Sequence, residues 1–326
     1  MLRVLVDFGS LDNLVRHHSD TAVASRTLKL PTSYELCLSR SGHFIAAVGR
    51  KVVVSDMRTR CRLHSTHPLS HPSHADFSPD DRHLVVKSTW GEIALLETHS
   101  GEKLASYRPR RQDEGARILF GADGVSLVDG AWSGEIRIRH TSDLSAVESF
   151  VFVGEMICAV SRSELGDLWL FGHTTKTLPE PSTTPSPYLS LWQWPLRGPM
   201  KKLDAGLKIL NAAALSPDGS CIAVVGHCDQ ENGKVLRLLS TDGVLLASTS
   251  LALGGTGSST RWSSDSKLVG TVSKGEFRIF SAPDLHPYAA YPEEYPADLA
   301  FVSGSNELVL GSWSAGRSAA LPTSDA

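Results

Sequence analysis

Short hydrophobic runs recur at regular intervals along this chain, and a turn sequence precedes many of them. The clearest turn is Ala214-Leu215-Ser216-Pro217-Asp218-Gly219, which leads into the apolar run 221–225. Pro presets φ in such a turn, while Asp and Gly supply a side-chain hydrogen bond and a left-handed residue that reverse the chain. The pattern therefore predicts a β-hairpin. Related turns precede apolar runs at 38–42, 77–81, 120–124, 262–266 and 301–305.

From Tyr34 onward, each unit is predicted to contain four strands, here named a, b, c and d in chain order. The turn just described joins strands a and b. Strand c alternates apolar and polar residues, as in Ile-Arg-Ile-Arg at 136–139. A second turn, between strands c and d, also recurs, for example at 240–243. Two turn types alternating roughly every 40 residues are typical of β-propeller blades. The seven units begin near residues 34, 72, 115, 155, 209, 256 and 296.

The seventh unit ends after strand c, near residues 319–321, and so lacks one strand. Residues 21–30 alternate and stop at Pro31, and we expect them to fill this place, because pairing with residues 316–321 removes two exposed sheet edges. The predicted fold is all-β: a seven-bladed β-propeller of four-stranded antiparallel blades, closed by the N-terminal strand. We expect an N-terminal extension at 1–20, one propeller domain at 21–322, and a tail at 323–326.

Over residues 21–322 these units resemble those of WD-repeat β-propellers. The resemblance rests on the Ser-Pro-Asp-Gly turns, the alternation in strand c and the repeat length. The Trp-Asp dipeptide that ends strand c in that family is mostly replaced, for example by Ser55-Asp56 and Trp192-Gln193, and the Gly-His dipeptide is missing. We therefore expect apolar packing between blades, rather than the family's hydrogen-bonded network, to provide stability. The resemblance implies a protein or peptide partner.

Composition and charge narrow the class of protein. A formal net charge of -3 argues against general nucleic-acid binding. No run approaches the roughly 18 apolar residues of a membrane span, and Asp7 interrupts the first apolar run, which is atypical of a signal peptide. The cysteines are odd in number and lack paired spacing, which favours a reducing compartment, so we expect a cytoplasmic protein.

Three units carry a tryptophan in the turn between strands b and c: Trp90, Trp132 and Trp313. In a four-stranded blade, the d–a and b–c loops lie on one face of the disc, so these rings should share a rim. Exposed tryptophans on such a rim are typical of an interaction hot spot. The alternative is that each ring covers its own turn or the neighbouring blade.

The d–a loop between the second and third units contains Arg108, Arg110 and Arg111. Arginine forks suit a carboxylate or phosphate on a partner, so an acidic or phosphorylated segment is the predicted ligand. The alternative is a solvated loop that Asp113 and Glu114 neutralise internally.

The preceding d–a loop contains four histidines, His64, His67, His71 and His74, interleaved with prolines. Imidazoles three or four residues apart could bind zinc. The prolines keep the loop extended, however, and no carboxylate or thiol joins the set. A solvated, pH-sensitive loop is therefore favoured, and no metal or cofactor is predicted.

Catalytic motifs are not recognisable: the chain has neither a Gly-x-Ser-x-Gly elbow nor a Walker loop. The leading hypothesis is a non-enzymatic scaffold that binds a protein or peptide through the d–a/b–c face. One alternative is a small-molecule-binding or hydrolytic propeller with its site in the axial depression. Another is a subunit of a larger assembly, with no affinity of its own outside it.

Overall fold

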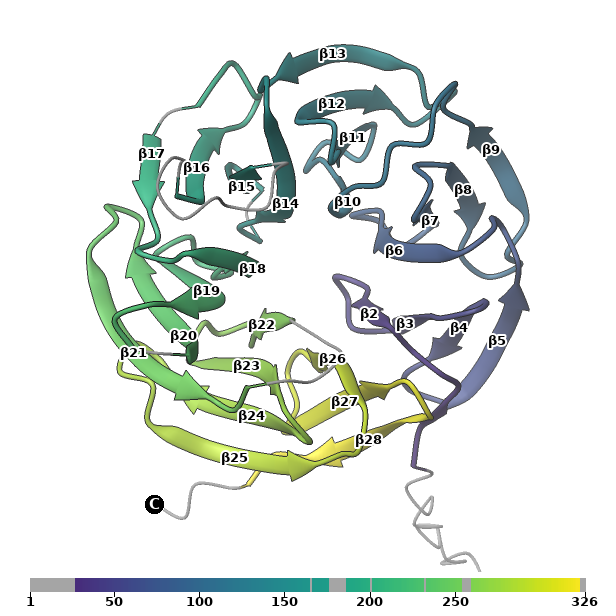
Figure 1. Ribbon diagram of the computed structural model, residues 1–326. Coiled ribbons are helices and arrows are strands. Elements are labelled where there is room, and N and C mark those ends of the chain that lie inside the picture. The colour runs from purple at the N-terminus through teal and green to yellow at the C-terminus, as the bar shows by residue number, and fades with distance from the viewer. Residues whose placement is uncertain are drawn as a thin grey trace, which may run out of the picture.

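The computed structural model describes residues 27–164, 166–175, 186–199, 201–231, 233–253 and 259–322. Its strands form seven four-stranded sheets arranged around a central axis (Figure 1). Each sheet is a blade, and consecutive strands within it pair in antiparallel fashion, as in β2–β3 and β3–β4. This confirms the predicted all-β, seven-bladed propeller. In the described ranges, no helix is long and apolar enough to cross a membrane.

Blades 1 to 3 follow one another along the chain, and strand a of each lies nearest the axis (Figure 1). Their strands are β2 (Glu35–Leu38), β3 (Phe44–Val48), β4 (Val52–Asp56) and β5 (Cys61–Thr66); β6 (Pro72–Phe77), β7 (His83–Ser88), β8 (Ile93–Glu97) and β9 (Lys103–Tyr107); β10 (Ile118–Phe120), β11 (Ser126–Gly130), β12 (Glu135–His140) and β13 (Ala146–Val151).

Blades 4 to 7 repeat this order and complete the disc. Their strands are β14 (Glu155–Arg162), β15 (Leu168–Thr175), β16 (Tyr188–Gln193) and β17 (Lys201–Asp204); β18 (Ile209–Leu215), β19 (Cys221–Cys228), β20 (Gly233–Ser240) and β21 (Leu245–Leu251); β22 (Thr260–Trp262), β23 (Leu268–Ser273), β24 (Glu276–Ser281) and β25 (Pro287–Pro292); β26 (Pro296–Phe301), β27 (Glu307–Ser312) and β28 (Gly316–Ala320).

The ring is closed by β1 (Lys29–Leu30), which is the outermost strand of blade 7. Lys29 pairs with Arg317 and Leu30 with Gly316, as the predicted closure requires. Leu28 and Leu30 are 1% and 3% exposed and pack into an apolar cluster shared by blades 7 and 1. Residues 21–26 of the predicted strand lie outside the described residues.

The a–b turns owe their geometry to the residues that made them recognisable. In blade 5, the Ser216 hydroxyl donates to Asp218 at 2.6 Å, and Gly219 has a φ of 72°. Blade 2 repeats the hydroxyl–carboxylate contact between Ser78 and Asp80, also at 2.6 Å. The same local chemistry thus forms the hairpin in separate blades.

Apolar side chains fill the space between neighbouring blades. For example, Val54 of blade 1 lies in one buried cluster with Phe77 and Val86 of blade 2. Leu238 of blade 5 packs in the same way with Phe280 of blade 6. Burial of facing sheets is the expected main source of stability in such a stack.

A buried ionic cluster, which the sequence did not predict, lies between blades 2 and 3. Lys87 Nζ donates to Asp129 Oδ1 at 2.5 Å and to the carbonyl oxygens of Ala116 and Gly130 at 3.3 and 2.7 Å. Arg139 Nε donates to the other carboxylate oxygen of Asp129 at 2.9 Å. The side chains of Lys87, Asp129 and Arg139 are all at most 2% exposed, so two buried cations share one carboxylate inside the protein.

The predicted histidine loop is shorter than expected, because the flanking strands extend into it. His64 lies in β5, and its Nε2 contacts Thr98 O at 2.9 Å, at a c–d turn on the opposite face of the disc. His74 lies in β6, which starts at Pro72, a position where the missing N–H of proline is tolerated. Placing these two histidines in the loop was therefore wrong, whereas His67 and His71 do lie in it. Most of the Pro-rich stretch 177–187 lies outside the described residues.

Candidate functional site

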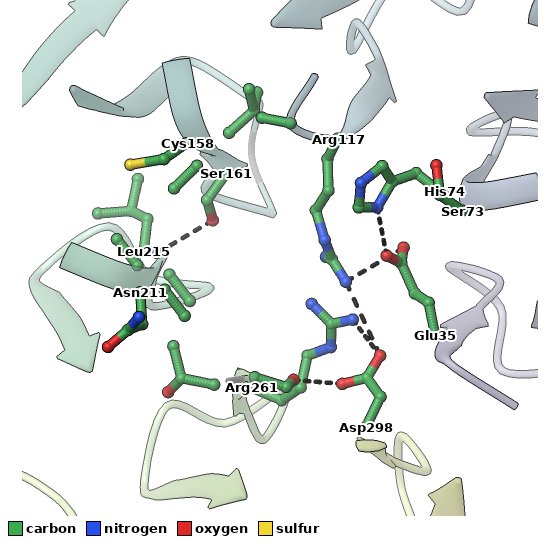
Figure 2. Close-up of a pocket in the computed structure, with 18 of the residues that line it drawn as sticks. Glu35, Ser73, His74, Arg117, Cys158, Ser161, Asn211, Leu215, Arg261 and Asp298 are labelled. Carbon is green, nitrogen blue, oxygen red and sulfur yellow. Dashed lines mark hydrogen bonds and ion pairs between the residues drawn. The ribbon is translucent and has the colours of Figure 1, made fainter. Parts of the chain in front are cut away.

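A cavity of about 500 Å³ occupies the centre of the disc. Strand a of each blade, or the residues just before it, contribute to its wall. Its lining includes ionisable side chains from several blades on one side and small side chains on the other (Figure 2).

The charged side of the cavity is a network of ion pairs. Glu35 lies 2.5 Å from His74 Nδ1 and 3.2 Å from Arg117. Asp298 pairs with Arg261 and lies 3.9 Å from Arg117 (Figure 2). Arg117 thus bridges two carboxylates, and its side chain keeps 27% exposure to the cavity.

These residues occupy equivalent places in their blades. Each lies four residues before a turn residue, and the backbone N–H of that turn residue donates to the carbonyl oxygen of the first residue of strand b. Blades 7, 1, 2 and 3 carry charged or titratable residues at this level, whereas blades 4, 5 and 6 carry small ones, which divides the ring into two halves. In order from blade 1 to blade 7, the residues are Glu35, His74, Arg117, Ala159, Ala212, Ser259 and Asp298.

Buried carboxylates around the axis also join neighbouring blades. Asp298 accepts a hydrogen bond from Leu36 N at 2.9 Å, and Asp76 accepts one from Phe120 N at 2.7 Å. Burial raises the pKa of both carboxyl groups, although Arg261 and Arg162 oppose this. These contacts explain why ionisable residues interrupt otherwise apolar inner strands.

Two potential nucleophiles of the cavity, Ser73 and Cys158, are not arranged for catalysis. The Ser73 hydroxyl donates to Lys87 O at 3.2 Å, although His74 is its neighbour in the chain. Burial raises the pKa of the Cys158 thiol to about 12, so this thiol stays protonated at neutral pH. Within the described ranges, no group of three or more His, Cys, Asp or Glu residues could hold a metal ion.

Two of the predicted tryptophans, Trp132 and Trp313, line the cavity from the d–a/b–c face. Trp132 N donates to Glu114 O at 2.6 Å and Trp313 N to Tyr295 O at 3.0 Å, so each b–c turn is fixed to a d–a loop. The Trp313 ring also packs on Tyr34, with centroids 4.2 Å apart. The two tryptophans nevertheless remain 40% and 45% exposed.

The third tryptophan, Trp90, lies on the same face outside the cavity lining and is 38% exposed. Its ring packs against His71, with centroids 4.9 Å apart. Beside it, Arg108 Nε pairs with Glu92 at 2.7 Å, and Pro109 helps to line a small hollow. Trp90, His71 and Arg108 therefore come together as one group.

The arginine loop is held between two b–c turns. Asp113 N donates to Trp90 O at 3.3 Å, and the Asp113 carboxylate pairs with Arg137 at 2.6 Å. Asp113 is thus engaged by blade 3 and does not neutralise the loop's own arginines. Arg110 and Arg111 are exposed and form no ion pair with any described residue.

Four residues of the axial network escaped prediction from the sequence: Glu35, Arg117, Arg261 and Asp298. A signal was present, since each interrupts or adjoins an apolar strand a that faces the axis. Conversely, the structure separates His64 and His74 from the loop histidines, and His67 lines a groove that also includes Arg50 and Arg108.

Comparisons with known proteins extend only to the fold. No protein-family model matches the sequence, and no curated protein matches it. Many solved structures share the architecture. One is the β-propeller domain of Cps50 (Swd1) from Myceliophteria thermophila, which is similar with a TM-score of 0.73 and 13% sequence identity, over 91% of this chain and 99% of that one. At this level of identity, the similarity establishes a shared β-propeller fold and nothing about function.

Proposed function

We propose that this protein is a non-enzymatic interaction scaffold that binds an acidic or phosphorylated segment of a partner protein on its d–a/b–c face. We also propose that it is a divergent WD-repeat propeller, on the basis of its turns and repeat length. The observation that carries the functional proposal is the pair of half-exposed tryptophans, Trp132 and Trp313, at the axial cavity.

Fixed aromatic side chains make good anchors because little conformational entropy is lost when a partner covers them. Backbone hydrogen bonds fix the turns of Trp132 and Trp313 to neighbouring loops, and the Trp313 ring is also held by packing on Tyr34. They come from blades 3 and 7, so an extended segment that contacts both would cross the mouth of the cavity.

The partner's charge is proposed from the arginine loop beside this mouth. Arg110 and Arg111 are exposed without an ion pair to a described residue, and the loop that carries them is fixed on both sides. Exposed guanidinium groups favour carboxylates and phosphates and accelerate the approach of an anionic partner.

The test compares proteins that the immobilised chain retains from a native lysate, identified by mass spectrometry. We expect Trp132→Ala/Trp313→Ala to lose partners that the wild type retains, with at least about a tenfold loss of affinity. A matched control is Val125→Ala/Val244→Ala, which truncates two residues that are 50% and 60% exposed on the opposite face.

The electrostatic part is tested on a partner found in this way. Arg110→Glu/Arg111→Glu should slow association and reduce its salt dependence. An unchanged set of partners in the tryptophan variant would contradict the proposed face. Unchanged association kinetics in the arginine variant would contradict the acidic nature of the partner.

A second candidate, a small anionic ligand in the axial cavity, is favoured by one observation: Arg117 is 27% exposed toward a cavity of about 500 Å³. A thermal-shift screen of anionic metabolites should then give a stabilisation that Arg117→Gln removes. Stabilisation that survives this substitution would count against the axial site.

A further inference from the structure

A second basic region lies in a groove of about 630 Å³ where blades 7 and 1 meet, and it runs from the b–c turn of blade 1 along β4 to the c–d turn. Five cationic residues line it, and none of its described lining residues is acidic. The cations are Lys29, Arg50, Lys51, Arg60 and Arg62. This seam groove is unusual in a chain whose formal net charge is -3.

The closure of the ring brings these residues together. The N-terminal segment passes from blade 7 to β2 near the axis, across the seam (Figure 1). Thr32 of this segment lies directly against Gly49, where a Cβ would be only 2.2 Å from Thr32 O. Gly49 N in turn donates to Lys51 O at 2.9 Å, which keeps the b–c turn tight. The groove therefore combines Lys29 of β1 with a turn of blade 1.

The groove has an excess of positive charge that the described part of the chain does not neutralise. Arg60 pairs with Glu307 at 2.5 Å, across the seam. Lys29, Lys51 and Arg62 are exposed, and none forms an ion pair with a described residue; the same holds for Arg50. Like charges gathered in a concave surface repel one another and concentrate anions from solution.

The spacing of the cations indicates the shape of the anion. Arg50 and Lys51 precede β4, and Arg60 follows it at the c–d turn, so the groove extends along a strand of five residues. At about 3.3 Å per residue, the charges span roughly 17 Å. An extended chain with several negative charges matches this length, whereas a single small anion would meet only part of it.

Other polyanions fit this groove less well. A single-stranded nucleic acid favours aromatic rings on which its bases stack, and the described lining contains none. A membrane surface favours exposed apolar side chains, but Val53 in the groove is only 5% exposed. Serine and threonine hydroxyls, as in Thr32 and Ser65, complete the lining and suit hydrogen bonds to a peptide.

We propose that the seam groove binds an extended acidic segment of a partner protein. Its lining shares no residue with the tryptophans or the arginine loop, so the test of this groove does not decide the proposal for those residues. Carboxylate and phosphoserine side chains share the required chemistry, and the experiment distinguishes them.

The test is fluorescence anisotropy with a labelled hexaglutamate peptide flanked by glycines, its phosphoserine counterpart and its glutamine counterpart. We expect the two anionic peptides to bind and the glutamine peptide not to. Binding should weaken as salt rises from 0.05 to 0.3 M, because exposed charges are screened over a distance of about 10 Å at 0.1 M. A stronger response to phosphoserine would identify a phosphorylated partner.

Lys51→Glu/Arg62→Glu should reduce the affinity at least about tenfold, while Lys51→Arg should preserve it. Lys267→Glu/Lys274→Glu, which alters two exposed lysines of blade 6 outside the groove, is a control with the same change in net charge, and it should leave the affinity within about twofold. Thermal unfolding verifies that each variant is folded. Equal losses in both double variants, no binding by the wild type, or a seam-dependent preference for oligothymidine or anionic vesicles would overturn the proposal.

Discussion

Lysine and arginine side chains lie at two junctions between blades, but their surroundings differ. They are buried between blades 2 and 3 and mostly exposed between blades 7 and 1. In the first, Asp129 lies between Lys87 and Arg139, and all three are at most 2% exposed. In the second, Arg60 pairs with Glu307, whereas its cationic neighbours face an open groove. A lysine or arginine between blades therefore acts in stability where the protein supplies the anion, and becomes available for binding where it does not.

The largest effect is expected from Asp129→Asn. This change leaves Lys87 and Arg139 buried without their carboxylate, which typically costs about 3–5 kcal/mol. We expect a loss toward the upper end, measured as the free energy of unfolding in urea. The matched change at the open junction is Glu307→Gln, for which about 1 kcal/mol or less is expected, since its partner lies at a half-buried site. Equal losses at the two junctions would break the comparison.

The next largest loss of stability is expected from a change in the apolar contacts that close the ring between blades 7 and 1. Leu30→Ala should cost about 3–4 kcal/mol, because this residue is 3% exposed and its removal leaves a cavity between blades 7 and 1. Lys29→Ala, on the neighbouring exposed residue of β1, should cost about 0.5 kcal/mol or less. If Leu30→Ala were as stable as the wild type in urea, β1 would not hold the ring closed.

A buried histidine in blade 4 should make the stability of the protein depend on pH. His173 is fully buried between Tyr188 and Ser190, and burial lowers its pKa from 6.5 to about 4. Between these two pKa values, the imidazole binds a proton more readily in the unfolded chain than in the folded protein. The contribution of neutral His173 to the free energy of unfolding is therefore complete above pH 6.5 and is lost as the pH falls toward 4. The loss amounts to about 3 kcal/mol when complete. His173→Gln should remove this component from the pH dependence of unfolding, and an unchanged profile would contradict the assignment.

The smallest effect on stability is expected at the seam groove. Lys51→Glu/Arg62→Glu should change the free energy of unfolding by only about 0.5 kcal/mol, because both side chains are exposed and lack an ion pair with a described residue. A loss of several kcal/mol in urea would show that these cations hold the fold, as Lys87 does, and would remove the distinction between the junctions.

Local signals predicted the fold well, whereas contacts between blades had to be observed. Ser216, Asp218 and Gly219 form their turn through short-range interactions, so their pattern alone predicted the hairpin. Lys87 and Asp129 meet only because two blades pack together, and neither residue carries a signal of its partner.

In the candidate site, too, local features could be predicted from the sequence, whereas contacts between blades could not. The three b–c tryptophans could be placed on one face from the repeat, but which of them border the cavity depends on the orientation of each turn. His64 and His74 were misplaced because the neighbouring strands continue beyond the predicted loop. The seam groove joins Lys29 to Arg62 through the closure of the ring, which no stretch of sequence displays.

The most direct test of the proposed role of unpaired cations is to locate the bound acidic peptide. A hexaglutamate peptide carrying a benzophenone group would be photo-crosslinked to the full chain at low salt and mapped by mass spectrometry. The account predicts attachment within residues 29–32 and 50–65, with Lys51→Glu/Arg62→Glu abolishing it. Attachment absent from these two ranges, or spread over the whole surface, would contradict it.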